Sequence, residues 1–67
     1  MINYEPLWST LEKKGITSGQ LVTQLHFSGG QLSRMRNGYY IHTRTIDKLC
    51  KLLDCKIEDI IKYEKGE

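Results

Sequence analysis

The chain has 67 residues, of which 39% are hydrophobic and 27% are charged. These proportions are typical of a globular protein and exclude the disordered and fibrous classes. A chain of this length makes one domain, residues 1–67, and buries only about 60% of the surface that its unfolded form exposes. No apolar run approaches the ~20 residues of a membrane span, and the first residues lack a signal-peptide pattern, so we expect a cytoplasmic protein.

The formal net charge is only +2, but the charges are unevenly distributed along the chain. The three arginines, Arg34, Arg36 and Arg44, lie within eleven residues of one another, and Asp47 is the only acid nearby. Residues 54–67 hold five acids against three lysines. A basic middle and an acidic end favour one face for phosphates and another turned away from them, although ordinary solvated charge produces the same pattern.

A first helix is predicted to begin at residues 3–6, where the single proline costs no hydrogen bond, and to end at Gly15. Its inward stripe consists of Leu7, Trp8 and Leu11. We expect the indole of Trp8 to pack in or against the core rather than to stack on a base, because large aromatic rings are most often used for burial.

A second helix is predicted from Thr17 to Leu25. Thr17 and Gln20 have the spacing of a capping box. The free N–H groups of the first turn and the hydroxyls of Thr17 and Ser18 make this helix start a candidate anion-binding site. Gly19 costs about 1 kcal/mol inside a helix. We expect a close approach of its backbone, either to the next helix or to a phosphate, to explain it.

A third helix is predicted between Ser28 and the Asn37-Gly38 pair, which tolerates positive φ and ends helices. Ser28 and Gln31 repeat the capping-box spacing. At 100° per residue, Leu32 and Met35 fall on one side of this helix. The opposite side carries no acid and consists of Gly30, Ser33, Arg34 and Asn37. Such a helix can lie close against a polyanion.

The remaining segments complete a helical domain. Ile41 is expected to enter the core, whereas Tyr39 and Tyr40 suit either packing or contact with nucleic acid. A fourth helix begins near Thr43, with a stripe made of Ile46, Leu49, Cys50 and Leu53. A fifth amphipathic helix is predicted from the spacing of Ile57, Ile60, Ile61 and Tyr63. No strand is predicted, because the alternation at residues 2–4 is too short.

Two short helices separated only by His26 and Phe27 have the layout of a helix-turn-helix. At this point the chain resembles the Cro/phage-repressor-like (XRE-type) helix-turn-helix transcriptional regulators. Its opening, Tyr4-Glu5-Pro6-Leu7-Trp8, and its close, Leu53-Asp54-Cys55 with Asp59-Ile60, are similar to a compact single-domain subgroup. The other matching stretches are Leu7-Trp8-x-x-Leu11-x-x-x-Gly15-Ile16-Thr17, then Leu21, then Ser28-x-x-x-Leu32-Ser33-Arg34-Met35-Arg36-Asn37-Gly38, and Ile46-x-x-Leu49-Cys50.

The resemblance implies an all-α fold, a five-helix lambda-repressor-like domain with its helix-turn-helix at about 17–37. It also implies sequence-specific binding of double-stranded DNA by a small transcriptional regulator, a repressor, with the recognition helix 28–37 in the major groove. One such domain reaches about four or five base pairs, so a homodimer is expected, in contact through the fifth helix around Ile61 and Tyr63. The alternative is a helix-turn-helix used as a protein-interaction module, such as an antitoxin or accessory subunit.

By position in the family pattern, the DNA-binding residues divide into three sets. A phosphate at the start of the second helix is held by Thr17 and Ser18. The groove is faced by Ser28, Gly29, Gly30, Ser33 and Arg34. The flanking phosphates are gripped by the backbone at Asn37 with Arg36 and Arg44. Arg34 is the candidate for reading a guanine; relatives often carry amides where Gly29 and Gly30 stand, which shifts specificity onto Arg34, Ser33 and DNA shape or weakens it.

Other chemistry is not indicated. Cys50 and Cys55 are predicted not to share a face and to act as small buried hydrophobes. Together with His26 and His42 they match no zinc-site spacing. No nucleophile elbow, Walker loop or dinucleotide fingerprint occurs, so we expect neither an enzyme nor a cofactor, metal or small-molecule ligand, and no membrane partner.

Overall fold

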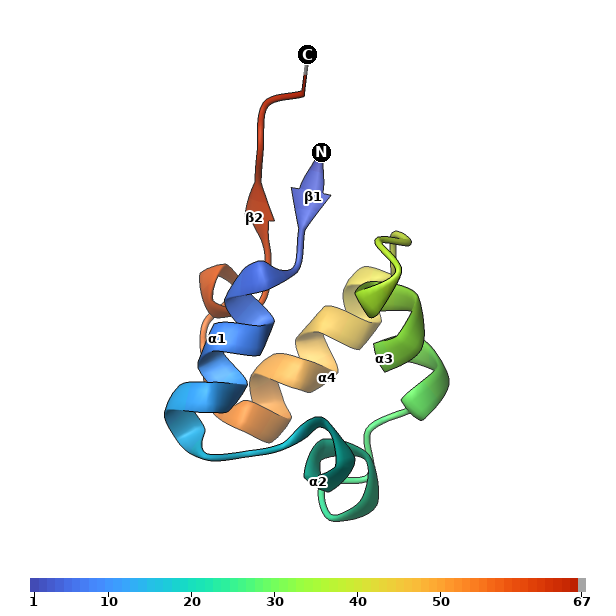
Figure 1. Cartoon of the computed structure of the whole chain (residues 1–67), viewed down its shortest axis with the longest axis vertical. Coiled ribbons are helices and arrows are strands. Elements are labelled where there is room, and N and C mark those ends of the chain that lie inside the picture. The colour runs from blue at the N-terminus through green and yellow to red at the C-terminus, as the bar shows by residue number, and fades with distance from the viewer. Residues whose placement is uncertain (67) are drawn as a thin grey trace.

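The computed structural model describes residues 1–66, which contain four α-helices, one 3-10 turn and two short strands. In chain order the elements are β1 (Ile2–Asn3), α1 (Glu5–Lys14), α2 (Ser18–Thr23), α3 (Gly29–Arg36), α4 (Thr43–Leu53), the 3-10 turn η1 (Ile57–Asp59) and β2 (Lys62–Tyr63). Helix α4 runs through the middle of the domain, with α1 on one side and α2 and α3 on the other (Figure 1). No helix within residues 1–66 has the length and apolar character needed to cross a membrane.

One apolar core joins these elements. Helix α4 contributes its centre, because Leu49 is fully buried and Ile46 and Leu53 lie about one turn to either side on the same face. Burying a side chain of this size is worth about 1.5–3 kcal/mol. The core side chains are Tyr4, Leu7, Leu11, Leu21, Phe27, Leu32, Met35, Ile46, Leu49, Leu53 and Ile60. Tyr4 and Phe27 lie outside every helix, so helical periodicity did not assign them to the core.

The turn between α2 and α3 explains why Phe27 is buried. Helix α2 was predicted to end at Leu25 but ends at Thr23, and His26 adopts a left-handed φ of 60°. A helix that continued through this segment would place Leu25 and Phe27 about 200° apart around its axis. The turn instead brings both side chains against the core, and the Phe27 N–H donates to the carbonyl of Leu21 at 3.0 Å.

Side-chain caps set the starts of the two helices of the motif. The predicted capping box of α2 is confirmed, since Thr17 Oγ1 accepts from the Gln20 N–H at 3.0 Å and Gln20 Oε1 accepts from the Thr17 N–H at 2.9 Å. At α3, Ser28 Oγ accepts from the Gln31 N–H at 3.2 Å, which is the hydroxyl half of the predicted box. Both caps satisfy N–H groups that have no partner inside a helix.

The predicted fifth helix is wrong, and the all-α fold class is corrected to four helices with a 3-10 turn and a small sheet. The turn η1 is followed by one buried side chain, Ile60, and the chain then extends as β2. Ile57 stays 53% exposed, so this segment buries no helical stripe. Ile61 and Tyr63 suit a strand as well as a helix, because β-branched and aromatic residues fit an extended backbone.

The two strands pair the ends of the chain. Strand β1 runs antiparallel to β2, with Ile2 opposite Tyr63 and Asn3 opposite Lys62, and Figure 1 shows both ends leaving the helices side by side. Asn3 Nδ2 also donates to Glu64 Oε1 at 2.8 Å. A two-residue strand is not stable alone. Each of these strands therefore depends on a partner some sixty residues away, which local patterns do not reveal.

The two cysteines meet at the end of α4, contrary to the prediction that they do not share a face. Asp54 takes a left-handed φ of 49°, and the Cys55 N–H donates to the Cys50 carbonyl at 3.1 Å. Both side chains are free thiols and half-buried. Burial raises the pKa of the Cys55 thiol, and Cys50, through its charge and a hydrogen bond, and Asp59 raise it further against the opposite effect of Lys14.

Two glycines test how far backbone conformation, rather than packing, stabilises the fold. Gly15 ends α1 with a φ of 68° and has open space around it, so Gly15→Ala should cost about 1 kcal/mol through backbone strain alone. Gly19 lies in α2 with helical φ and room for a methyl group, so Gly19→Ala should stabilise by up to about 1 kcal/mol. Urea unfolding of both variants measures the two effects, and equal changes of the same sign would contradict this interpretation.

Candidate nucleic-acid interface

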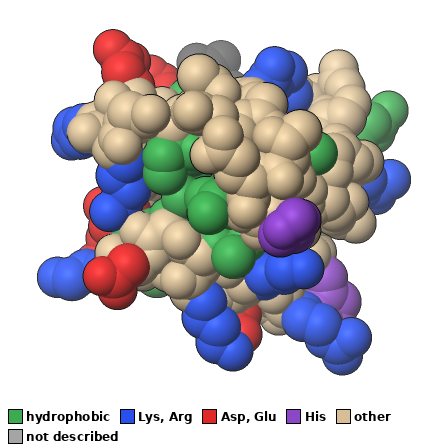
Figure 2. Space-filling model, turned by 90° about the horizontal axis from the view of Figure 1, so that it is seen from below, with side chains coloured by type: hydrophobic (Ala, Val, Ile, Leu, Met, Phe, Trp, Pro, Cys, Tyr) green, Lys and Arg blue, Asp and Glu red, His purple; other side chains and the backbone are tan. Residues whose placement is uncertain are grey.

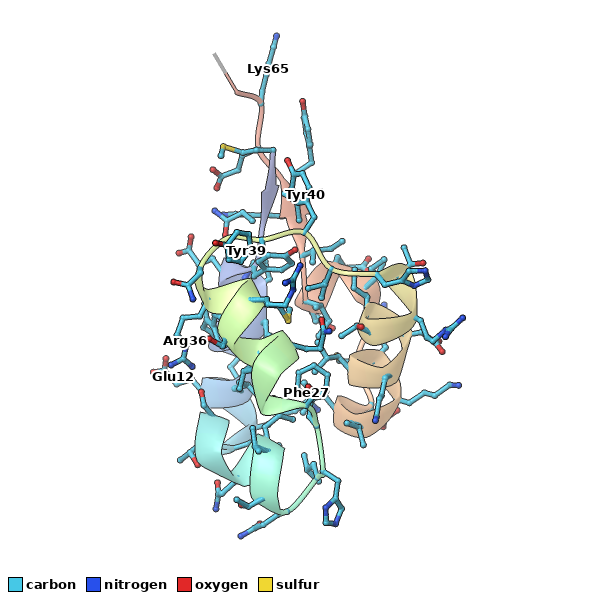
Figure 3. All side chains as sticks on the ribbon, turned by 90° about the vertical axis from the view of Figure 1, so that its right-hand side faces the viewer. Glu12, Phe27, Arg36, Tyr39, Tyr40 and Lys65 are labelled. Atoms are coloured by element: carbon cyan, nitrogen blue, oxygen red, sulfur yellow. The ribbon has the colours of Figure 1, made fainter. Side chains whose placement is uncertain are left out.

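Helix α3 presents one buried and one exposed side. Leu32 and Met35 are 5% and 2% exposed and hold the helix against the core, as predicted from the periodicity. The other side chains and glycines predicted to face a nucleic acid are exposed, namely Ser28, Gly29, Gly30, Ser33, Arg34, Arg36 and Asn37. Figure 3 shows α3 at the front of this view, running from near Phe27 at its start to near Tyr39 at its C-terminal end.

The exposed side of α3 has a positive electrostatic character. Neither α2 nor α3 contains an acid. Asp47, the nearest acid in sequence, pairs with Lys51 at 3.2 Å along α4. In the end view of Figure 2, most acidic side chains in sight lie on the left, with Lys or Arg beside them, while the lower right shows His and Lys or Arg side chains with little acid among them. Within residues 1–66, Arg34, Arg36 and Arg44 form no ion pair with a carboxylate.

A hollow between the starts of α3 and α4 combines polar and basic groups. Its lining includes Ser28 and Gln31 from α3 and Arg44 and Lys48 from α4. The Arg44 N–H donates to His42 Nδ1 at 3.0 Å, so this backbone group is capped while the guanidinium stays exposed. Lys48 was not among the predicted site residues. Its position four residues after Arg44 on one helix is the signal that places both on the same face.

Arg36 connects three helices. Its guanidinium lies over the indole ring of Trp8, 4.9 Å from the ring centroid, and its Nη2 donates to Ser18 Oγ at 2.7 Å. Trp8 is half-buried, in agreement with the packing role predicted for it. Arg36 was predicted to grip a phosphate. The structure places its charge beside the first turn of α2, next to the predicted phosphate position at Thr17 and Ser18.

Arg34 and Asn37 are fixed by local contacts. Arg34 Cζ lies 5.4 Å from the ring centroid of Tyr39, and the carbonyl of Tyr39 accepts from the buried Tyr4 hydroxyl at 2.7 Å. Tyr39 is therefore the tyrosine that lies beside the candidate reading residue, and both rings are largely exposed, Tyr39 at 59% and Tyr40 at 67%. The Asn37 N–H donates to the Ser33 carbonyl at 3.1 Å. Asn37 Nδ2 donates to the same carbonyl at 2.9 Å. The backbone donor predicted to hold a phosphate is thus occupied, and the second hydrogen of the side-chain amide is what Asn37 has left for such a contact.

The helical glycines are not explained by packing inside the protein. A methyl group at Gly19 would meet Thr17 Oγ1 at 3.8 Å, one at Gly29 would meet Val22 at 3.7 Å, and one at Gly30 would meet Ser28 Oγ at 3.7 Å, all ordinary contacts. The predicted approach of Gly19 to the third helix is therefore wrong. Gly19 and Gly29 instead line the same surface hollow between α2 and α3.

Comparisons with known proteins agree with this geometry. Residues 6–66 match the family described as the Cro/C1-type HTH DNA-binding domain, and no curated protein matches the chain. A solved structure described as that of the transcriptional regulator VanUg, crystal form II, superposes with a TM-score of 0.81 over 91% of this chain and 81% of that one. The two sequences are 21% identical, so this likeness concerns the fold. Because the family match spans nearly the whole chain, the protein belongs to the Cro/C1-type (XRE) helix-turn-helix DNA-binding domains, a non-enzymatic family.

Proposed function

We propose that this protein is a sequence-specific regulator that binds double-stranded DNA with α3 in the major groove and represses transcription by occupying its site. The observation that carries the proposal is the exposed, acid-free side of α3 between two groups of phosphate-binding residues. A helix has the right width for the major groove, and phosphate contacts on either side would hold it in register.

The two flanking groups lie on different elements. On one side, the start of α2 offers Thr17 and Ser18, with Arg36 beside them. On the other side, Arg44 and Lys48 of α4 border the start of α3. Contacts of this kind supply affinity that depends steeply on salt but carry little sequence information.

Sequence reading then falls to the exposed side of α3. A guanidinium can pair bidentately with the O6 and N7 acceptors of guanine, and each such pair is worth about 1–3 kcal/mol of discrimination. Arg34 is suited to this role, because Tyr39 restrains its side chain and Arg36 is held by Trp8 and Ser18. Ser33, the residue before Arg34, offers an exposed hydroxyl as a further donor.

The glycines at the start of α3 support a close approach to the DNA. Gly29 and Gly30 are exposed, have helical φ and are not required by internal packing. Without Cβ atoms, the first turn of α3 can come nearer to the groove than a turn with side chains. Bases under this turn would be selected by shape and by the contacts of neighbouring residues rather than by glycine itself.

A homodimer remains part of the proposal, because one domain of this size covers only half of a typical operator. The contact expected around Ile61 and Tyr63 falls on strand β2 and the residue before it instead of on a helix. Tyr63 is 72% exposed there, whereas Ile61 packs partly against the core. Of these two residues, Tyr63 is thus the one that is exposed enough to contact a second copy of the chain.

Binding to duplex DNA selected from genomic fragments tests the function. We expect log affinity to fall linearly with log salt, with a slope that reflects several phosphate contacts. Arg44→Ala should weaken all sequences alike and reduce that slope by about 1, whereas Arg34→Ala should relax discrimination at one base pair by about 1–3 kcal/mol. Lys65→Ala is the control, because it removes one positive charge at the sheet end of the molecule, away from α3 and α4 (Figure 3). Salt-independent binding, or none, would favour the protein-interaction alternative.

Arg36 should contribute to both stability and binding. Arg36→Lys keeps the charge but loses the planar group over Trp8, so we expect the free energy of unfolding to fall by about 0.5–1 kcal/mol with the salt slope unchanged. Arg36→Ala should lower stability similarly and also reduce the slope by about 1. Chemical unfolding and fluorescence titration separate the two effects, and an unchanged slope for the alanine variant would remove Arg36 from the phosphate contacts.

The close approach of α3 has its own test. Gly29→Ala and Gly30→Ala should leave the protein at least as stable, because both positions have helical φ and room for a methyl group. Each should nevertheless weaken DNA binding by about tenfold, or about 1.4 kcal/mol, by holding the helix away from the groove. Gly66→Ala, in open space near the chain end, is the control. Undiminished affinity of both helix variants would show that α3 does not need its glycines to reach DNA.

A further inference from the structure

The C-terminal end of α4 and the residues just after it carry a pair of thiols that the proposed DNA binding does not use. Cys50 and Cys55 are both half-buried and free. They lie at the C-terminal end of α4, which is beside α1 and away from the start of α3 (Figure 1). Neither residue lines the hollows beside α3 described above.

The backbone brings these two residues together. The left-handed φ of Asp54 reverses the chain, and the Cys55 N–H returns to the Cys50 carbonyl at 3.1 Å. This 6→1 hydrogen bond is that of the Schellman motif, a common helix ending. In this motif the side chains of the two residues joined by the bond, here Cys50 and Cys55, commonly pack on each other. Here both positions are cysteine, and both side chains pack against the core at the same end of α4.

We propose that Cys50 and Cys55 form a reversible dithiol site that reacts with low-molecular-weight disulfides and closes to an intramolecular disulfide. A disulfide needs Cα atoms about 4.4–6.8 Å apart and side chains that face each other. The direct backbone hydrogen bond keeps the two residues adjacent, and the helix ending to which it belongs turns their side chains toward each other. Half-burial leaves the sulfur atoms within reach of a small reagent.

The reaction is an ordinary two-step exchange. The thiolate of one cysteine attacks a sulfur of the small disulfide, and one small thiol leaves, so that a mixed disulfide forms on the protein. The second cysteine then attacks the protein sulfur of that mixed disulfide, and the second small thiol leaves. The pair loses two protons and two electrons, and the small disulfide gains both.

Equilibration of the full-length protein with oxidised and reduced glutathione, followed by alkylation and intact mass measurement, tests the site. We expect two species, the dithiol with two labels and an unlabelled monomer lighter by two hydrogens. Cys50→Ser and Cys55→Ser should each accumulate a glutathione adduct instead. A wild-type protein that accumulates adducts to the same extent, forms disulfide-linked dimers or stays reduced would overturn the proposal.

A comparison with the unfolded chain shows whether the fold builds the site, since nearby cysteines can also pair in a flexible chain. The disulfide of the folded protein should be at least about tenfold more stable than that formed in urea, a shift of about 30 mV in midpoint potential. A double variant, Cys50→Ser with Lys51→Cys, moves one thiol about 100° around α4 and should lose this advantage. Circular dichroism verifies that the variant is folded. Equal stabilities in either comparison would overturn the proposal.

Discussion

The use of α3 depends on the burial of two of its side chains. Leu32 and Met35 insert into the core and fix the rotation of the helix about its axis. The opposite side then faces solvent, with no internal acid to oppose a phosphate. An eight-residue helix is too short to be stable alone, so this rotation is imposed by the neighbours of α3 rather than by its own hydrogen bonds. The exposed side is therefore free to carry residues that weaken a helix, such as Gly29 and Gly30.

Helices with a clear start, stripe and stop could be predicted from the sequence. Helices α1, α3 and α4 combine apolar residues at helical spacing with recognisable ends, and the Thr17–Gln20 capping box was confirmed atom by atom. The 57–63 segment failed because its isoleucines and tyrosine suit two periods at once. The choice between helix and strand was made by pairing with residues 2–3 at the other end of the chain, and no local pattern contains that information.

The features of the candidate site also divide into those that local sequence predicts and those that depend on tertiary packing. Exposure of the residues on α3 follows from periodicity, since it depends only on which side of the helix is buried. The contacts of Arg36 do not, because they require Trp8 from α1 and Ser18 from α2 at one point in space. Lys48 was missed because its link to the site is the packing of α4 beside the start of α3. Local chemistry thus predicts which side chains are exposed, and tertiary packing decides which of them act together.

The contacts of Arg36 with Trp8 and Ser18 link the proposed DNA binding to the stability of the domain. In a small domain each contact between helices is a large fraction of a marginal total. The guanidinium contacts Trp8 of α1 and Ser18 of α2 and thereby ties both helices to α3, at the start of α2 where we propose that a phosphate binds. A phosphate bound there would share hydrogen-bond donors with Ser18 instead of replacing a buried contact, because Arg36 retains further N–H groups. Binding would then hold α2 and α3 more firmly at their present angle. The same side chain would thus stabilise both the free motif and its bound form.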